Sequence, residues 1–106
     1  MSKFKEPVFL IAGDTYTKLA LEVRVRCLLH QAQLGVELDT PDQAFMLDVL
    51  RRHPEAESKI GAGIRAIRIT TSQWGNRCFE AMRVDGTSVE FSYLKCLKQK
   101  RERARG

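Results

Sequence analysis

The dipeptide Asp85-Gly86 separates two short runs, residues 77–84 and 87–91, in a part of the chain where the hydrophobic period is close to two. Asp-Gly supplies the positive φ angles that a tight type I′ turn requires. We therefore predict a β-hairpin with a two-residue loop. Such a loop would place these residues opposite each other: Val84 with Thr87, and Arg83 with Ser88.

Further strands are expected on both sides of a helical middle. Residues 64–70 are rich in β-branched side chains and predict a strand, followed by a polar loop that holds the single tryptophan, Trp74. Near the N-terminus, the apolar run 7–12 predicts a first strand closed by Gly13-Asp14. Residues 15–17 then form an optional short return strand.

The stretch 18–34 carries two competing patterns. Five apolar side chains recur at helical spacing, whereas residues 21–27 also alternate between apolar and charged, as in a strand. Length favours the helix, because a periodic stretch of about seventeen residues is long for a strand. Thr17 suits the N-cap of this helix, and Gly35 suits its end.

A second helix is indicated by the sequence Thr40-Pro41, with threonine as the N-cap and proline at the first helical position. Asp42 places an acid in the first turn, and Gln43 is the expected capping-box partner. The helix should end at His53-Pro54, because the residue before a proline disfavours helical geometry.

Residues 55–60 predict one more helical turn, closed by Gly61, in which Glu55 and Lys59 pair one turn apart. The following Gly61-Ala62-Gly63 is not a phosphate-binding loop, because it follows a helix and no Lys-Ser/Thr comes after it. Its glycines should instead let the backbone turn sharply.

A last helix should begin at Tyr93, with Ser92 as its N-cap and with Leu94 and Leu97 facing inwards. The element order is then β-(β)-α-α-β-β-β-α. This order predicts an α+β fold in which a small antiparallel sheet packs against two to four helices.

Positive charge is concentrated at the C-terminal end. Residues 1–94 contain twelve Lys/Arg and twelve Asp/Glu, so residues 95–106 carry the whole net charge of +5. A chain of 106 residues suits one domain, which we expect over residues 1–97, followed by a basic tail, residues 98–106. Such a tail attracts polyanions, chiefly nucleic acid or an anionic membrane surface, although a merely solvated tail has the same composition.

The cysteines and apolar runs bear on the compartment. Three cysteines without a C-x-x-C pair argue against a disulfide framework and against a structural zinc site. No apolar run approaches the roughly 18–20 residues that span a bilayer, and the first residues lack the features of a secretory signal. We therefore expect a cytoplasmic protein with no cofactor, no metal and no membrane insertion.

No arrangement of side chains demands catalysis. His53 lies at a helix end, where a structural histidine capping backbone carbonyls is the simpler interpretation. The alternative is a nuclease-type enzyme in which His53 acts with Lys59 or Arg77. His30 lies near the C-terminus of the first helix, where its charge would favour the helix dipole.

Residues 45–97 contain several short fragments in a characteristic order. They are Phe45-Met46-Leu47 with Leu50 and His53-Pro54; Lys59-Ile60-Gly61-x-Gly63-Ile64; Arg77-Cys78-Phe79; Arg83-x-Asp85-Gly86; and Phe91-Ser92-Tyr93-x-Lys95-Cys96. Together they resemble the DCL family, named for "defective chloroplasts and leaves". The chain departs from the family pattern at Ala62, where a cysteine is common, and at Leu94, where an aromatic residue is common.

The resemblance implies a link to RNA. Plant members of the family are associated with plastid ribosomal RNA processing, and a related domain lies at the C-terminal end of the largest subunit of plant-specific RNA polymerases. Short bacterial members are a domain of unknown function, with no established catalytic residue to carry over. Ala62 in place of cysteine argues against a cysteine-based metal or redox site.

The motif glycines suit turns, and Phe79 and Phe91 suit the core of the sheet, but the motif cations need another explanation. We predict that they contact phosphates, while aromatic rings stack on unpaired bases. The alternative is that the arginines pair with Glu80 or Glu90 on a solvated face of the sheet. The predicted contact residues are Lys59, Trp74, Arg77, Arg83, Tyr93, Lys95, Lys98, Lys100, Arg101, Arg103 and Arg105.

These observations predict a non-catalytic module that binds RNA or ribonucleoprotein, in ribosomal RNA processing or ribonucleoprotein assembly. The alternative is a protein-interaction domain that docks on a polymerase or ribosomal complex.

Overall fold

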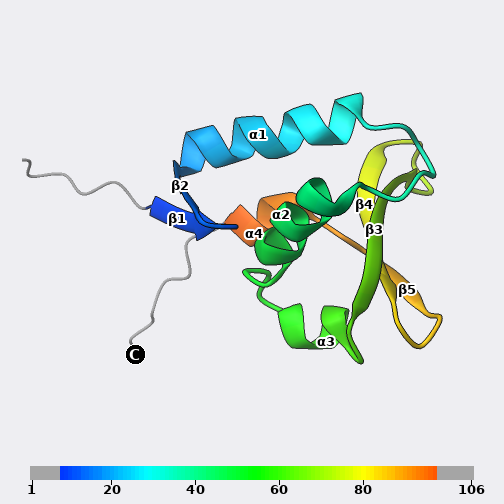
Figure 1. Ribbon diagram of the computed structural model, residues 1–106. Coiled ribbons are helices and arrows are strands. Elements are labelled where there is room, and N and C mark those ends of the chain that lie inside the picture. The colour runs from blue at the N-terminus through cyan, green and yellow to red at the C-terminus, as the bar shows by residue number, and fades with distance from the viewer. Residues whose placement is uncertain (1–7, 98–106) are drawn as a thin grey trace, which may run out of the picture.

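The computed structural model describes residues 8–97, which form an α+β fold with the predicted order of elements (Figure 1). The elements are β1 (Val8–Ile11), β2 (Asp14–Thr17), α1 (Lys18–Gln31), α2 (Thr40–Leu50), α3 (Ala56–Ile60), β3 (Ile64–Thr71), β4 (Arg77–Arg83), β5 (Ser88–Phe91) and α4 (Tyr93–Leu97). Two antiparallel sheets are present, β1-β2 and β3-β4-β5. Within residues 8–97, no helix has the length and apolar character needed to cross a membrane.

The loop between β4 and β5 differs from the predicted two-residue turn. Arg83 faces Thr87 rather than Ser88, since the amide of Arg83 donates to the carbonyl of Thr87 at 2.7 Å. The loop therefore has three residues, and only Gly86 has a positive φ, of 92°. The carboxylate of Asp85 accepts from the amide of Thr87 at 3.0 Å, which holds Asp85 in the turn without a positive φ. An αL glycine after a tight turn is the usual geometry of a three-residue hairpin loop.

The long N-terminal stretch is a helix, as its length predicted. Thr17 is the N-cap of α1, and its hydroxyl accepts from the amide of Ala20 at 3.1 Å. The helix ends at Gln31, before the expected position at Gly35. The chain leaves the helix early because it pairs with the free edge of β3, where the amide of Gly35 donates to the carbonyl of Ile69 at 2.8 Å.

The cap of α2 is shifted by one residue from the prediction. Asp39, not Thr40, is the N-cap, because its carboxylate accepts from the amide of Asp42 at 3.1 Å. Thr40 and Pro41 therefore belong to the first turn. Gln43 forms no capping box; its side-chain amide donates to the carbonyl of Arg65 on β3 at 3.2 Å. The helix ends at Leu50, just before His53-Pro54, as expected.

The core lies between the helices and one face of the three-stranded sheet, and α4 closes it (Figure 1). Cys96 and Leu97 of α4 are buried, whereas Leu94 is 53% exposed, so the prediction that Leu94 faces inwards is wrong. Tyr93, Cys96 and Leu97 follow the i, i+3, i+4 spacing of one helix face, and Leu94 lies outside it. The side chains that contribute most fully buried volume are Phe79, Ile11, Leu21, Met46, Leu50, Ile67 and Ile69.

Candidate anion-binding groove

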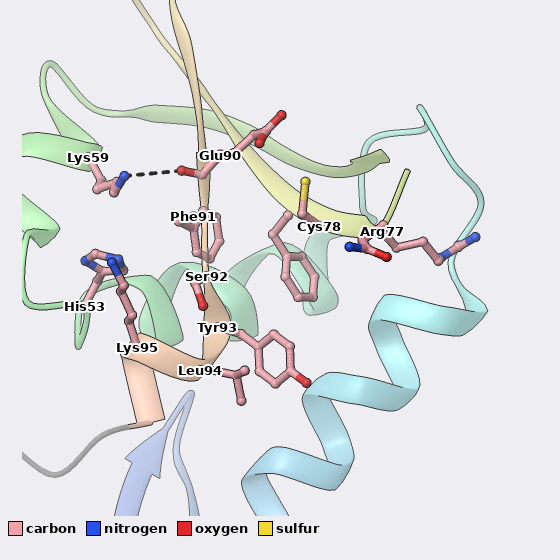
Figure 2. A pocket seen from close by; sticks show the side chains of 12 residues that line it. His53, Lys59, Arg77, Cys78, Glu90, Phe91, Ser92, Tyr93, Leu94 and Lys95 are labelled. Atoms are coloured by element: carbon pink, nitrogen blue, oxygen red, sulfur yellow. Dashed lines mark hydrogen bonds between the residues drawn. The ribbon is translucent and has the colours of Figure 1, made fainter. Parts of the chain in front are cut away.

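A groove of about 530 Å³ opens where β5 leads into α4 (Figure 2). At one end its walls carry the side chains of His53, Lys59 and Lys95. Farther along, Tyr93 and Cys78 line it. The groove therefore has a cationic end and an aromatic wall, built from the end of α2, from α3, from β4 and β5, and from α4.

Lys59 lies on the short helix α3 and reaches β5. Its ammonium donates to the backbone carbonyl of Glu90 at 3.3 Å, the bond drawn in Figure 2. The ion pair predicted between Lys59 and Glu55 does not form among the described residues, whose ion pairs involve other side chains. One N–H of Lys59 is thus used to hold α3 against β5, and the charge remains at the wall of the groove.

His53 is buried, with 5% of its surface exposed, and lies in the turn after α2. Its Nδ1 accepts from the amide of Glu55 at 2.9 Å, so the ring does not cap helix carbonyls as predicted; it caps the next turn of backbone. A neutral ring that accepts at Nδ1 carries its proton on Nε2. The pKa of His53 lies below its usual value because of burial, then because of Lys59 and Lys95, with Glu55 acting in the opposite direction.

Lys95 projects from α4 towards His53 (Figure 2). Of the four causes that shift the pKa of His53, Lys95 is the smallest, and it lowers the pKa. Within residues 8–97, no hydrogen-bond or ion-pair partner is found for this ammonium. Lys95 therefore presents an uncompensated positive charge in the described groove.

Arg77 lies at the start of β4 and serves a different purpose. Its Nε donates to the carbonyl of Leu29 at 2.7 Å, and its Nη2 donates to the carbonyl of Ala32. These carbonyls lie at the C-terminal end of α1, where a cation also favours the helix dipole. Arg77 lines the far end of the groove, with its guanidinium bound to the fold.

Arg83 plays the same part at the other end of β4. Its Nε donates to the carbonyl of Lys59 at 2.9 Å and its Nη2 to that of Ser58 at 3.3 Å, so it caps α3. Its Nη1 donates to the hydroxyl of Thr87 at 2.8 Å. Gly61, which has a φ of 56°, packs against the side chain of Arg83. A Cβ at this position would lie only 3.0 Å from Arg83 Nε. Arg83 is thus held against the turn, outside the groove.

Neither arginine pairs with an acid as the solvated-face alternative supposed. Glu80 is bound by Arg68 at 2.6 Å and by the hydroxyl of Ser88 at 3.0 Å. The carboxylate of Glu90 points away from both lysines in Figure 2.

The two predicted aromatic contacts lie in different places. Trp74 is 78% exposed in the connection between β3 and β4 and does not line the groove, although Asn76 in the same connection does. Tyr93 is half-buried in the groove wall, edge-on to Phe79 with 6.3 Å between ring centroids. Burial raises the pKa of Tyr93. The remaining predicted cations lie outside the described residues: Lys98, Lys100, Arg101, Arg103 and Arg105.

The other motif residues divide between the core and the groove. Phe79 and Phe91 are buried and stacked at 5.7 Å, and Cys96 is buried enough that its pKa rises to about 12. Cys78 lines the groove as a protonated thiol, because burial and then Glu90 raise its pKa. Pro54 and Gly63 lie in the turns before α3 and β3, and Asp85-Gly86 forms the hairpin loop. Ser92 lines the groove where β5 meets α4.

Sequence reasoning did not identify Asn76, Glu90 and Leu94 as lining residues. The two-residue loop predicted from the sequence would have set Glu90 opposite Ala81, whereas the observed register sets it opposite Glu80 on β4. Nothing in the sequence signalled Leu94, because its exposure depends on how α4 is rotated against the core.

The fold and the groove define a small α+β domain with a cationic cleft. Residues 26–97 match the family model described as "Protein of unknown function (DUF3223)", and the chain belongs to this family. The chloroplastic protein DCL homolog of Arabidopsis thaliana is 44% identical over 79 residues, which are 70% of this chain and 36% of that protein. The resemblance to the DCL family is therefore confirmed.

Two further comparisons extend the family. Subunit 1 of DNA-directed RNA polymerase IV of Arabidopsis thaliana is 37% identical over 78 residues, which are 73% of this chain but only 5% of the subunit. The solution NMR structure of an uncharacterized protein from Rhodospirillum rubrum is 34% identical, with a TM-score of 0.78, and covers 90% of this chain and 91% of that one. The chain thus spans a minor part of its plant relatives and nearly the whole of this bacterial protein.

Proposed function

We propose that this chain is a non-catalytic RNA-associated binding module, in ribosomal RNA processing or ribonucleoprotein assembly, that holds a nucleic-acid backbone at the cationic end of its groove. Lys59 and Lys95 come from separate elements and line the same groove. Helix α4, which carries Lys95, ends at Leu97, directly before the five cations of residues 98–106. The observation that carries the proposal is this succession of groove cations and basic tail.

In this proposal, residues 1–97 form the binding domain, residues 98–106 act as its accessory tail, and the protein works in the cytoplasm. The relatives support a role near RNA, since one of them is a subunit of a DNA-directed RNA polymerase. Arg77 and Arg83 have been assigned to helix capping by their hydrogen bonds. The proposed phosphate contacts are accordingly the two groove lysines and the tail, with Tyr93 as the aromatic neighbour.

The test is a titration of fluorescent single-stranded RNA at several salt concentrations. Each phosphate contact on a single strand contributes about −0.7 to the slope of log K against log salt. Two groove lysines and five tail cations therefore give a slope of about −5. A slope near zero, or no binding at low salt, would contradict the proposal.

Matched variants separate groove from tail. The double substitution Lys59→Gln and Lys95→Gln should reduce the slope by about 1.4, and replacing the five tail cations by Gln should reduce it by about 3.5. Lys18→Gln is the control, because it removes one lysine at the start of α1, away from the groove. If only net charge mattered, Lys18→Gln would lose about 0.7 in slope, half the loss of the double groove variant, and a control loss of that size would contradict a specific role for the groove.

A second candidate function, docking on a polymerase or ribosomal complex, is favoured by exposed apolar side chains on α1. Leu19 is 70% exposed and Val23 is 50% exposed, and they lie one turn apart on the same face. Docking through this face predicts that Leu19→Ser with Val23→Ser abolishes capture of a protein partner while leaving RNA affinity unchanged.

A further inference from the structure

The cationic end of the groove contains more hydrogen-bond donors than the described fold uses. The Nε2–H of His53 has no acceptor within residues 8–97, although only 5% of the residue is exposed. Lys95 has no partner there either, and Lys59 uses one of its three N–H groups on the carbonyl of Glu90. A buried polar group is normally paired, so the Nε2–H of His53 needs an acceptor, whereas the half-buried Lys59 and the exposed Lys95 place their ammonium groups within reach of solvent.

Electrostatics at this place favour an anion. Two ammonium groups act on one buried imidazole, and both disfavour its protonation. The carboxylates nearest to the cluster are Glu55, which favours protonation of His53, and Glu90, which lines the groove. Among the described residues, neither forms an ion pair with Lys59 or Lys95. Glu55 offsets part of the positive potential at the ring, but no ion pair among the described residues neutralises either ammonium group, and a bound anion would relieve their repulsion.

The charge of the cluster indicates which anion fits. A phosphomonoester carries about −1.5 to −2 at neutral pH and has three acceptor oxygens, whereas an internal phosphodiester or a carboxylate carries only −1. Three donors line one end of the groove, two of them charged, and their number matches the three oxygens of a terminal phosphate. Beyond the cluster, Tyr93 and the 53% exposed Leu94 offer an apolar wall for the attached nucleoside.

We propose that His53, Lys59 and Lys95 form a site for the terminal phosphomonoester of an RNA strand, so that the groove recognises strand ends in preference to internal positions. This inference rests on the proposed RNA-binding function. It explains why Lys95 lies exposed beside a buried histidine, and it assigns the basic tail to the diester backbone that leads away from the end.

The test compares four RNAs of the same sequence, about 12 nucleotides long, which is within the range that small single-strand binders cover. One carries a 5′-phosphate, one a 3′-phosphate, one both, and one hydroxyls at both ends. At least one strand with a phosphorylated end should bind roughly tenfold more tightly than the hydroxyl-ended strand, because the hydroxyl end lacks the charged group that the site binds. The 5′ and 3′ arms decide which end is recognised.

Two variants tie the preference to the cluster. Lys95→Gln should reduce the preference for a phosphorylated end to within about twofold, and it should weaken binding of the hydroxyl-ended strand only by the one phosphate contact that Lys95 makes, about 0.7 in the salt slope. His53→Asn keeps an acceptor near the position of Nδ1 but removes the Nε2–H donor, and it should also reduce the preference. Lys18→Gln should leave the preference intact, and near-UV circular dichroism checks that each variant is folded.

The outcomes separate this inference from the function on which it rests. Equal affinity for all four strands, with a steep salt dependence, overturns the end-recognition site alone. No binding of any strand overturns the RNA-binding function together with it. A preference that survives in Lys95→Gln also overturns the inference, because the phosphate would then be bound elsewhere.

Discussion

The ends of β4 and the cationic end of the groove use positive charge in opposite ways. Arg77 and Arg83 bend back onto the last carbonyls of α1 and α3, and their charges serve the fold. Lys59 and Lys95 line the groove. Among the described residues, only one hydrogen bond ties either ammonium to the fold, the bond from Lys59 to the carbonyl of Glu90. All four are cations of the same motif set, yet their surroundings divide them into two pairs.

The chemistry of the two side chains accounts for this division. A guanidinium presents several donors in a fixed fork, which suits two carbonyls at a helix end, whereas an ammonium is a compact charge on a flexible stem. A helix that terminates beside a strand therefore selects arginine as a brace. Lysine at a groove wall keeps its charge available to a ligand. Whether a cation is arginine or lysine, and whether it lies beside a helix end, therefore indicates its role better than the number of cations does.

The largest expected effect is at Arg77. Arg77→Met keeps the length of the stem but leaves the carbonyls of Leu29 and Ala32 without their donor. Hydrogen bonds to a charged group each contribute about 1.5–3 kcal/mol, and because both bonds are only partly buried we expect the lower part of their sum, a fall of about 3–4 kcal/mol in the free energy of unfolding. Urea denaturation followed by circular dichroism measures this change.

Arg77→Lys and Lys95→Gln are the matched comparisons. Lysine cannot reproduce the fork, so Arg77→Lys should recover less than half of the loss. Lys95→Gln, on the exposed side of α4, should change stability by no more than about 0.5 kcal/mol. If Lys95→Gln proved as destabilising as Arg77→Met, the distinction between bracing and groove cations would be wrong.

A smaller loss is expected at Arg83. Arg83→Met removes the donors to Lys59 and Ser58, but α3 is a single short turn with no buried residue of its own. The free energy of unfolding should fall by about 1–2 kcal/mol. Because Arg83 holds α3, the helix that carries Lys59, Arg83→Met should also lower RNA affinity slightly. Arg77→Met should not lower it in this way, because Arg77 holds α1.

Thermal denaturation and the RNA titration, made on the same sample, provide the two measurements for Arg83→Met. An unchanged melting temperature would show that the hydrogen bonds from Arg83 are not important for the turn. A loss of stability larger than that of Arg77→Met would reverse the order argued from helix length.

Much of the fold was predictable because local signals agreed with the packing. The order of elements, the helix starting at Thr17 and the end of α2 before His53-Pro54 follow from capping and from proline geometry. Two of the errors lie where neighbouring polar side chains compete for the same local hydrogen bond. Asp39 took the N-cap of α2 because its side chain reached the amide of Asp42, and the hairpin loop gained a residue through the contacts of Asp85.

The site was less predictable because it depends on contacts between residues far apart in the sequence. The sequence placed Lys59 and Lys95 among the candidate cations, but it had no means of separating them from Arg77 and Arg83. That separation depends on carbonyls that come close only when α1 and α3 pack against β4. The free Nε2–H of His53 likewise depends on the turn after α2, in which Nδ1 accepts from the amide of Glu55.

The smallest effect is a pH dependence of stability that reports on the cluster. Burial, Lys59 and Lys95 lower the pKa of His53 in the folded protein below the 6.5 of an unfolded chain. The full contribution of the neutral ring is therefore present above about pH 6.5. As the pH falls towards the folded pKa, the unfolded state takes up a proton that the folded state does not, and stability declines by at most about 1.4 kcal/mol per pH unit.

Urea denaturation between about pH 7.5 and 5.5 measures this decline, and His53→Asn isolates it from the titration of other groups. Lys95→Gln should make the decline shallower, because it removes one of the two ammonium groups that oppose protonation. Arg77→Lys keeps the charge at the far end of the groove and should leave the slope unchanged. A slope that responds to Arg77→Lys but not to Lys95→Gln would mean that the lysine does not face the ring, and the contrast between bracing arginines and groove lysines would lose its electrostatic basis.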